Sequence, residues 1–175
     1  MAGDVHILLV DDSANFLMAG QELLRSQQAT FVIAVAADAE RALFSIRQQD
    51  YHVIISDIGL PGLDGLQLLT ECQRIRPDTP VILITGYGDR EIEDEAARAG
   101  AYAFLHKPVD PDTFCSVVQR AVLRAQIRRR PELVLGEDTY WYMQAREQIH
   151  RRSDEINERL RQALKDYGLP PDQMS

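Results

Sequence analysis

Cysteine is scarce in this chain of 175 residues: Cys72 and Cys115 lie far apart and away from any cluster of histidines. This spacing excludes a disulfide framework and a cysteine-based metal site. The four histidines also lack metal-binding spacing and are expected at strand ends or on the surface; they are His6, His52, His106 and His150. Two unclustered cysteines in an acidic chain indicate reduced thiols and predict a cytoplasmic protein.

Long apolar runs are also missing. The first residues, MAGDVHILLV, have no basic region and only a short apolar run, so we expect no signal peptide. No run approaches the roughly 20 residues that a membrane-spanning helix needs. An apolar content of 45% with 26% charged residues is typical of a globular protein. The length is enough for one ordinary domain and an appendage.

Positive charge is sparse in the first two thirds of the chain. Residues 1–124 hold 18 of the 27 acidic side chains and 10 of the 19 basic ones, which accounts for the whole net charge of -8. Residues 125–175 are neutral and rich in arginine. An acidic body argues against contact with nucleic-acid phosphates by that part.

Short apolar segments alternate with amphipathic ones along residues 4–124. We expect strands at 5–10, 30–36, 51–56, 81–85 and 102–106. Helices are expected over 13–27, after Asp38, over 64–76 with Leu66, Leu69 and Ile75 inward, over 89–99, and from Pro111. Five such repeats predict an α/β fold with a five-stranded parallel sheet, doubly wound in the flavodoxin-like order 2-1-3-4-5.

Reactive side chains follow four of the five expected strands. Asp11 and Asp12 follow the first, Asp57 the third, Thr85 ends the fourth, and Lys107 follows the fifth. Ligands of such folds bind beyond the carboxyl ends of the strands, so we expect these groups in one crevice. Three carboxylates together repel one another, and Mg²⁺ is the hard cation that suits them. With that cation bound, Asp57 could attack phosphorus while Lys107 neutralises charge on the transferred group.

These motifs resemble the receiver domain of two-component response regulators. They are DD at 11–12, DIGLPGLDG at 57–65, TG at 85–86 and FLHKP at 104–108. The resemblance covers roughly residues 4–124. It implies phosphorylation of Asp57 by a partner histidine kinase or phosphotransfer protein, with no other enzyme activity than slow autodephosphorylation.

The resemblance also implies roles for individual residues. Asp12, Asp57 and the carbonyl of Gly59 would bind Mg²⁺, with Asp11 acting through water. Thr85 and Phe104 would form a switch pair. The Lys107–Pro108 peptide bond is expected to be cis.

Two positions depart from the commonest receiver pattern. Gly59 lacks a side chain where many receivers carry one, and Tyr87 is bulky. Both flank the expected path of the water that removes the phosphoryl group. Our hypothesis is that Tyr87 shields the acyl phosphate and lengthens its life.

Each residue also has a plain alternative when taken alone. Asp11 could cap a helix, Thr85 could be an ordinary strand residue, and Lys107 could be a solvated surface lysine. A phosphatase of the haloacid dehalogenase type also uses an aspartyl phosphate. Such enzymes typically place their two acids two residues apart after the first strand, and this chain does not.

The segment beyond residue 124 is expected to comprise a helix extension and linker over 125–137 and a helix over 138–168. The second helix could pack on the receiver, mediate dimerisation or docking, or bind DNA through its arginines. We favour self-association or docking and consider nucleic acid unlikely, because charges of both signs balance there. The interpretation is a cytoplasmic response regulator that switches protein–protein association, also through the face made by the fourth helix, fifth strand and fifth helix. The alternative is a fragment of a transcriptional regulator whose DNA-binding or ATPase part is absent.

Overall fold

The computed structural model describes residues 4–86 and 90–129, which form a five-stranded parallel sheet flanked by helices. The strand order is β2-β1-β3-β4-β5, as predicted. The elements alternate along the chain as β1 (Val5–Val10), α1 (Ala14–Gln27), β2 (Phe31–Ala36), α2 (Ala39–Gln48), β3 (Val53–Asp57), α3 (Gly65–Ile75), β4 (Val81–Thr85), α4 (Arg90–Arg98), β5 (Ala103–His106) and α5 (Pro111–Arg129). None of the described helices is long and apolar enough to cross a bilayer.

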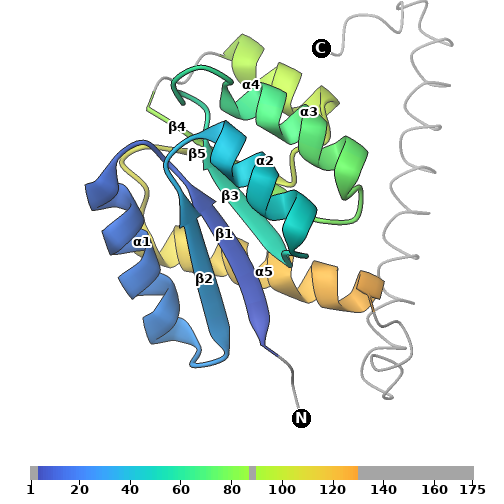
Figure 1. Cartoon of the computed structure of the whole chain (residues 1–175). Helices are drawn as coiled ribbons and strands as arrows, with labels where there is room; N and C mark the ends of the chain where they lie inside the picture. Colours follow the sequence, from blue (N-terminus) through green and yellow to red (C-terminus); the bar gives the residue numbers. More distant parts are fainter. Residues whose placement is uncertain (1–3, 87–89, 130–175) are drawn as a thin grey trace, which may run out of the picture. The chain divides into compact units, whose positions relative to one another are not determined.

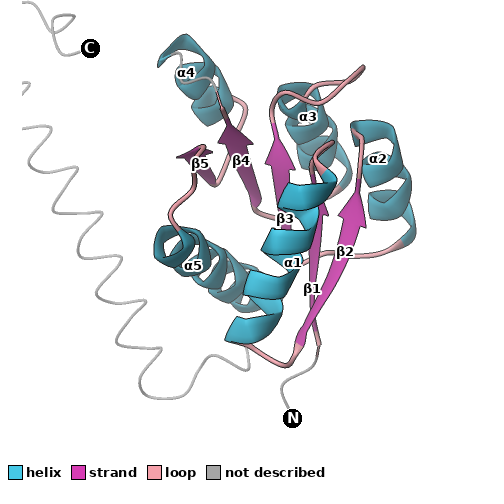
Figure 2. Ribbon diagram, turned by 90° about the vertical axis from the view of Figure 1, so that its left-hand side faces the viewer, coloured by secondary structure: helices cyan, strands magenta, loops and turns pink. Residues whose placement is uncertain are grey.

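The helices cover both faces of the sheet (Figures 1 and 2). Successive side chains of a strand point to opposite faces, so β1 contributes to two cores. Leu8 and Val10 pack with residues of α2, α3 and α4. Ile7 and Leu9 pack with residues of α1 and α5. This burial of both faces explains why the strand sequences are almost continuously apolar.

Side-chain caps fix where the helices begin. Ser13 caps α1, because its hydroxyl accepts the backbone N–H of Phe16 at 3.4 Å. Asp64 and Gln67 form a capping box at the start of α3. At α5, the Asp110 carboxylate accepts the backbone N–H of Thr113 at 2.8 Å. These contacts satisfy N–H groups that the first turn of a helix leaves unpaired.

The inner face of α3 differs from the prediction. The buried residues are Gly65, Leu68, Leu69 and Cys72, whereas Leu66 and Ile75 are only half-buried against the core. The buried set follows helical spacing of three and four residues. The prediction therefore identified the inward side, since Leu69 is buried and Leu66 and Ile75 pack against the core, but it omitted Gly65, Leu68 and Cys72.

Several predictions fall outside the described residues. They concern Tyr87, the helix start at 89 and the whole segment beyond Arg129. The last described helix, α5, continues past residue 124 to Arg129.

Candidate functional site

The strands end at Val10, Asp57, Thr85 and His106, at what we call the carboxyl edge. Of the polar side chains predicted to meet there, the structure brings together Asp11, Asp12, Asp57 and Lys107. The Lys107 Nζ atom lies 2.7 Å from Asp11 Oδ2 and 3.2 Å from Asp57 Oδ1. One cation that follows β5 therefore contacts acids from β1 and β3. The Lys107 side chain is 28% exposed and that of Asp11 is fully buried.

Asp11 is held by contacts on both carboxylate oxygens. Its Oδ1 accepts the backbone N–H of Ser13 at 2.8 Å, and its Oδ2 accepts a hydrogen bond from Lys107. Ser13 is the N-cap of α1, so Asp11 is not the cap that it could have been when judged alone. Its carboxylate instead faces the lysine.

Asp57 is the last residue of β3 and is 8% exposed. Burial raises the pKa of Asp57, Lys107 opposes this rise, and the neighbouring charges of Asp11 and Asp12 add to it. Lys107 is close enough for an ion pair, but its direction is poor for a hydrogen bond. The buried Oδ1 atom therefore has no hydrogen-bond partner among the described residues. A buried carboxylate oxygen in this state favours an additional cationic ligand.

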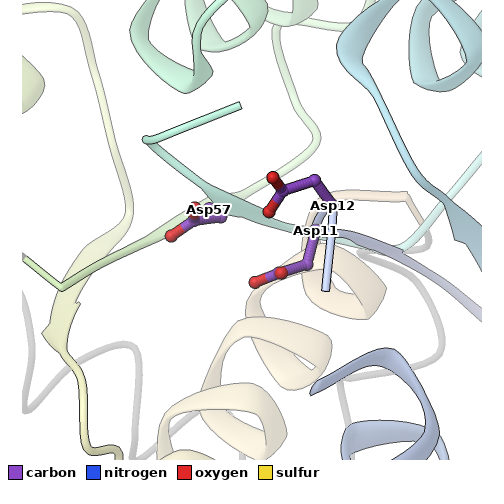
Figure 3. A group of neighbouring side chains, drawn as sticks. All are labelled: Asp11, Asp12 and Asp57. Carbon is purple, nitrogen blue, oxygen red and sulfur yellow. The ribbon is translucent and has the colours of Figure 1, made fainter. Parts of the chain in front are cut away.

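Three carboxylates at this edge could share a metal ion. One ligand oxygen from each of Asp11, Asp12 and Asp57 lies within 4.8 Å of the other two (Figure 3). Asp12 is exposed, whereas Asp11 and Asp57 are buried. Oxygen ligands that combine buried and solvent-facing carboxylates suit Mg²⁺, which keeps several water ligands. The donor set and the unpartnered oxygen of Asp57 therefore fit a magnesium site.

Two glycines let the backbone approach Asp57 closely. A Cβ atom on Gly65 would lie 2.3 Å from the carbonyl oxygen of Asp57, so only glycine fits there without a shift of the chain. A Cβ on Gly59 would lie 3.3 Å from Asp57 Oδ2. Gly65 is the first residue of α3, so the glycine is needed where this helix begins beside Asp57.

Thr85 and Phe104 lie on the neighbouring strands. Thr85 ends β4 and is 4% exposed, while Phe104 in β5 is half-buried. The Phe104 ring lies edge-on to the ring of His106, with centroids 5.2 Å apart. The Nε2 atom of His106 lies 2.6 Å from Glu93 Oε1, which connects β5 to α4.

One contact of Lys107 and the peptide bond that follows it complete the description. Its ammonium lies 4.6 Å from the centroid of the Phe16 ring in α1, a contact that the sequence analysis did not identify. The spacing of residues 16 and 107 carries no signal for it. The peptide bond that follows, Lys107–Pro108, is cis, as the resemblance implied.

The family model of the response regulator receiver domain matches residues 7–119. The chain belongs to the response regulator receiver family. In solved structures, the receiver domain protein (CheY-like) from Methanospirillum hungatei is similar with a TM-score of 0.68 and 27% identity. That match covers 72% of this chain and 99% of the other.

Relatives of this receiver domain are two-component response regulators. The chain is 38% identical over 148 residues to the C4-dicarboxylate transport transcriptional regulatory protein DctD of Pseudomonas aeruginosa, covering 83% of this chain and 30% of DctD. It is 31% identical over 129 residues to the transcriptional regulatory protein FixJ of Bradyrhizobium diazoefficiens, covering 74% and 62% respectively. The chain thus spans less than two thirds of the length of these relatives.

Proposed function

We propose that Asp57 accepts a phosphoryl group from a histidine kinase or phosphotransfer protein and that this changes how the protein associates with others. The observation that carries the proposal is the Lys107 ammonium, which contacts both Asp11 and Asp57 beside a third carboxylate. A cation at this point can neutralise charge on a group transferred to Asp57. Membership of the receiver family supports the same role.

In the proposed transfer, a carboxylate oxygen of Asp57 forms a bond to phosphorus while the bond from phosphorus to the donor imidazole nitrogen breaks. The donor histidine leaves with the electron pair of that bond and takes up a proton from water. Lys107 stays protonated throughout. Burial lowers the pKa of Lys107, but its hydrogen bond to Asp11 and the charges of Asp11 and Asp57 outweigh burial, and its pKa is raised above the ordinary value.

Asp12, Asp57 and the Gly59 carbonyl would hold Mg²⁺, with Asp11 acting through water. The metal would neutralise the carboxylates and charge on the phosphoryl oxygens. The charges of Asp11 and Asp12 add to the raised pKa of Asp57, so relief of their repulsion supports metal binding here. The Thr85 hydroxyl would bind a phosphoryl oxygen, and Phe104 would change its rotamer in response.

The output we favour is association through the face of α4, β5 and α5 or through the segment beyond Arg129. No enzyme activity beyond self-phosphorylation and slow autodephosphorylation is proposed. A second candidate output is control of transcription, because DctD and FixJ are transcriptional regulatory proteins. Mass measurement with and without beryllofluoride tests association, and an unchanged oligomeric state would leave transcription control through a further domain as the better proposal.

Phosphorylation itself is tested with acetyl phosphate and Mg²⁺, using a gel that retards phosphoproteins. The phosphorylated protein should appear as a retarded band that survives acid and is lost in base. We expect Asp57→Asn to abolish this phosphoprotein label, and chelation of Mg²⁺ should also abolish it. The matched control is Asp78→Asn, since Asp78 is exposed and pairs with Arg128. Label retained in Asp57→Asn at the wild-type level would refute the assignment of Asp57.

A further inference from the structure

Lys107 has a third neighbour besides the two acidic residues, and this neighbour is aromatic. Its ammonium lies 4.6 Å from the ring centroid of Phe16, in addition to its contacts with Asp11 and Asp57. Phe16 lies in the first turn of α1, where its backbone N–H is donated to the N-cap Ser13. The ring is therefore attached to the same helix start that orients Asp11 through the Ser13 N–H.

The Phe16 ring and Lys107 also line one apolar groove. This groove has a volume of about 390 Å³ and lies between α1 and the start of α5. Phe16, Gly20, Pro108 and Phe114 are among its lining residues. The flexible stem of a lysine has many rotamers, and a carboxylate pair alone restrains only its charged end. An aromatic face attracts the ammonium, so the ring adds a restraint beside that of the two carboxylates.

We propose that Phe16 is a positioning residue for phosphoryl transfer, and that the face of its ring holds the Lys107 ammonium between Asp11 and Asp57. The inference rests on the proposed role of Lys107 in phosphorylation of Asp57. Phe16 does not touch the reacting atoms. It limits how far the ammonium can swing away from the two carboxylates, so that the charge is in place when the bond to phosphorus forms.

The test replaces Phe16 in the full chain with phenylalanine carrying one, two or three ring fluorines, which weakens the attraction to a cation while nearly preserving shape. The rate of phosphorylation by acetyl phosphate is measured; the phosphorus–oxygen bond to acetate breaks as the bond to Asp57 forms. We expect a graded fall, reaching roughly threefold to tenfold for the trifluoro ring. Phe16→Tyr should stay near the wild type and Phe16→Leu should match the trifluoro protein.

The control series places the same fluorinated residues at Phe44, an exposed phenylalanine of α2, where the rate should not change. A second control is Lys107→Met, which should be slow and should respond no further to fluorination of Phe16. A flat series at position 16 beside a slow Lys107→Met protein would overturn the positioning role alone. Label retained in Asp57→Asn, or an unchanged rate in Lys107→Met, would instead overturn the proposed chemistry of the site.

Discussion

Ionisable side chains gather at both edges of the sheet, but the two edges differ in whether these side chains have hydrogen-bond partners. At the carboxyl edge, Asp11 and Asp57 meet Lys107. At the opposite end of β1 and β3, which we call the amino edge, His6 and His52 lie near Arg129. Each edge thus combines side chains from near β1 and β3 with one cation from the last part of the domain.

At the amino edge, His6, His52 and Arg129 each take part in a hydrogen bond. The backbone N–H of His6 donates to His52 Nδ1 at 3.1 Å, and the backbone N–H of His52 donates to the carbonyl of His6 at 2.7 Å. The His6 ring lies 2.7 Å from the amide of Gln49, and Arg129 donates to the carbonyl of Tyr51. The carboxyl edge instead leaves a buried oxygen of Asp57 without a hydrogen-bond partner among the described residues. The contacts of His6, His52 and Arg129 favour a structural role for them, whereas the unpartnered oxygen of Asp57 agrees with the proposal that a cation binds at the carboxyl edge.

The largest expected effect is a loss of stability, and it is tested by replacing one glycine at each edge with alanine. Gly65→Ala would place a Cβ 2.3 Å from the Asp57 carbonyl oxygen, and we expect it to lower the free energy of unfolding by about 3 kcal/mol. Gly100→Ala, before β5, meets no atom closer than 3.6 Å but keeps a φ of +90°, so about 1 kcal/mol is expected. Urea denaturation measures both, and equal losses would contradict the crowding at the carboxyl edge.

Asp57→Asn should stabilise the protein at neutral pH by about 1–2 kcal/mol. Burial raises the pKa of Asp57 in the folded state, so the ionised carboxylate lowers stability above that pKa. The advantage of the variant should therefore shrink as the pH falls through the raised pKa and vanish below the unfolded value. Thermal unfolding across this range checks the sign, and added Mg²⁺ should reduce the advantage by stabilising the wild type. Asp78→Asn serves as the control that should show neither trend.

His52 should give the opposite pH dependence. Its pKa is lowered from 6.5 to about 4, first by burial and then by the charges of Arg129 and His6. The unfolded chain then binds more protons than the folded one, so stability falls as the pH drops from 6.5 to about 4. Since His52 is half-exposed, we expect a loss of about 1 kcal/mol after solvent screening. Denaturation of His52→Gln across the same window should lack this component; an identical slope in both proteins would refute the assignment.

The smallest expected effect is the difference in stability between variants of two neighbouring arginines at the amino edge. Arg128 and Asp78 form an exposed ion pair at 2.9 Å, so Arg128→Met should change stability by less than about 0.5 kcal/mol. Arg129 donates to the carbonyl of the buried Tyr51, so Arg129→Met should cost about 1 kcal/mol. Paired urea titrations measure the difference, which disappears if the contact with Tyr51 is unimportant.

The sequence predicted the fold well because each strand is a short apolar run and each helix has a recognisable cap. It also predicted that Asp11, Asp12 and Asp57 would meet, since parallel strands end at one edge, and their proximity is confirmed. Their roles in metal binding and phosphorylation stay predictions. To predict that these three carboxylates lie close together, it was enough to know which segments are strands and in which direction they run.

Contacts that depend on register or side-chain rotamer could not be predicted. The pairing of Ile7 with Val53 places His6 beside His52, and nothing in the two histidines alone reveals this register. The contact between Phe16 and Lys107 depends on α1 starting after Ser13 and on the direction of a flexible side chain. The predicted inner face of α3 was incomplete, and it omitted Gly65 and Cys72, which contribute to that face without a strong apolar signal.

The position of the end of α5 limits how a change at Asp57 can affect the chain beyond Arg129. Arg129 lies at the Tyr51 carbonyl, six residues before Asp57 along nearly straight chain, which corresponds to about 20 Å. The screening length of physiological salt is about 8 Å, so negative charge gained at one end of β3 has little direct pull at the other. If the proposed phosphorylation acts beyond Arg129, the signal would therefore depend on a displacement of packed atoms, which α5 would transmit.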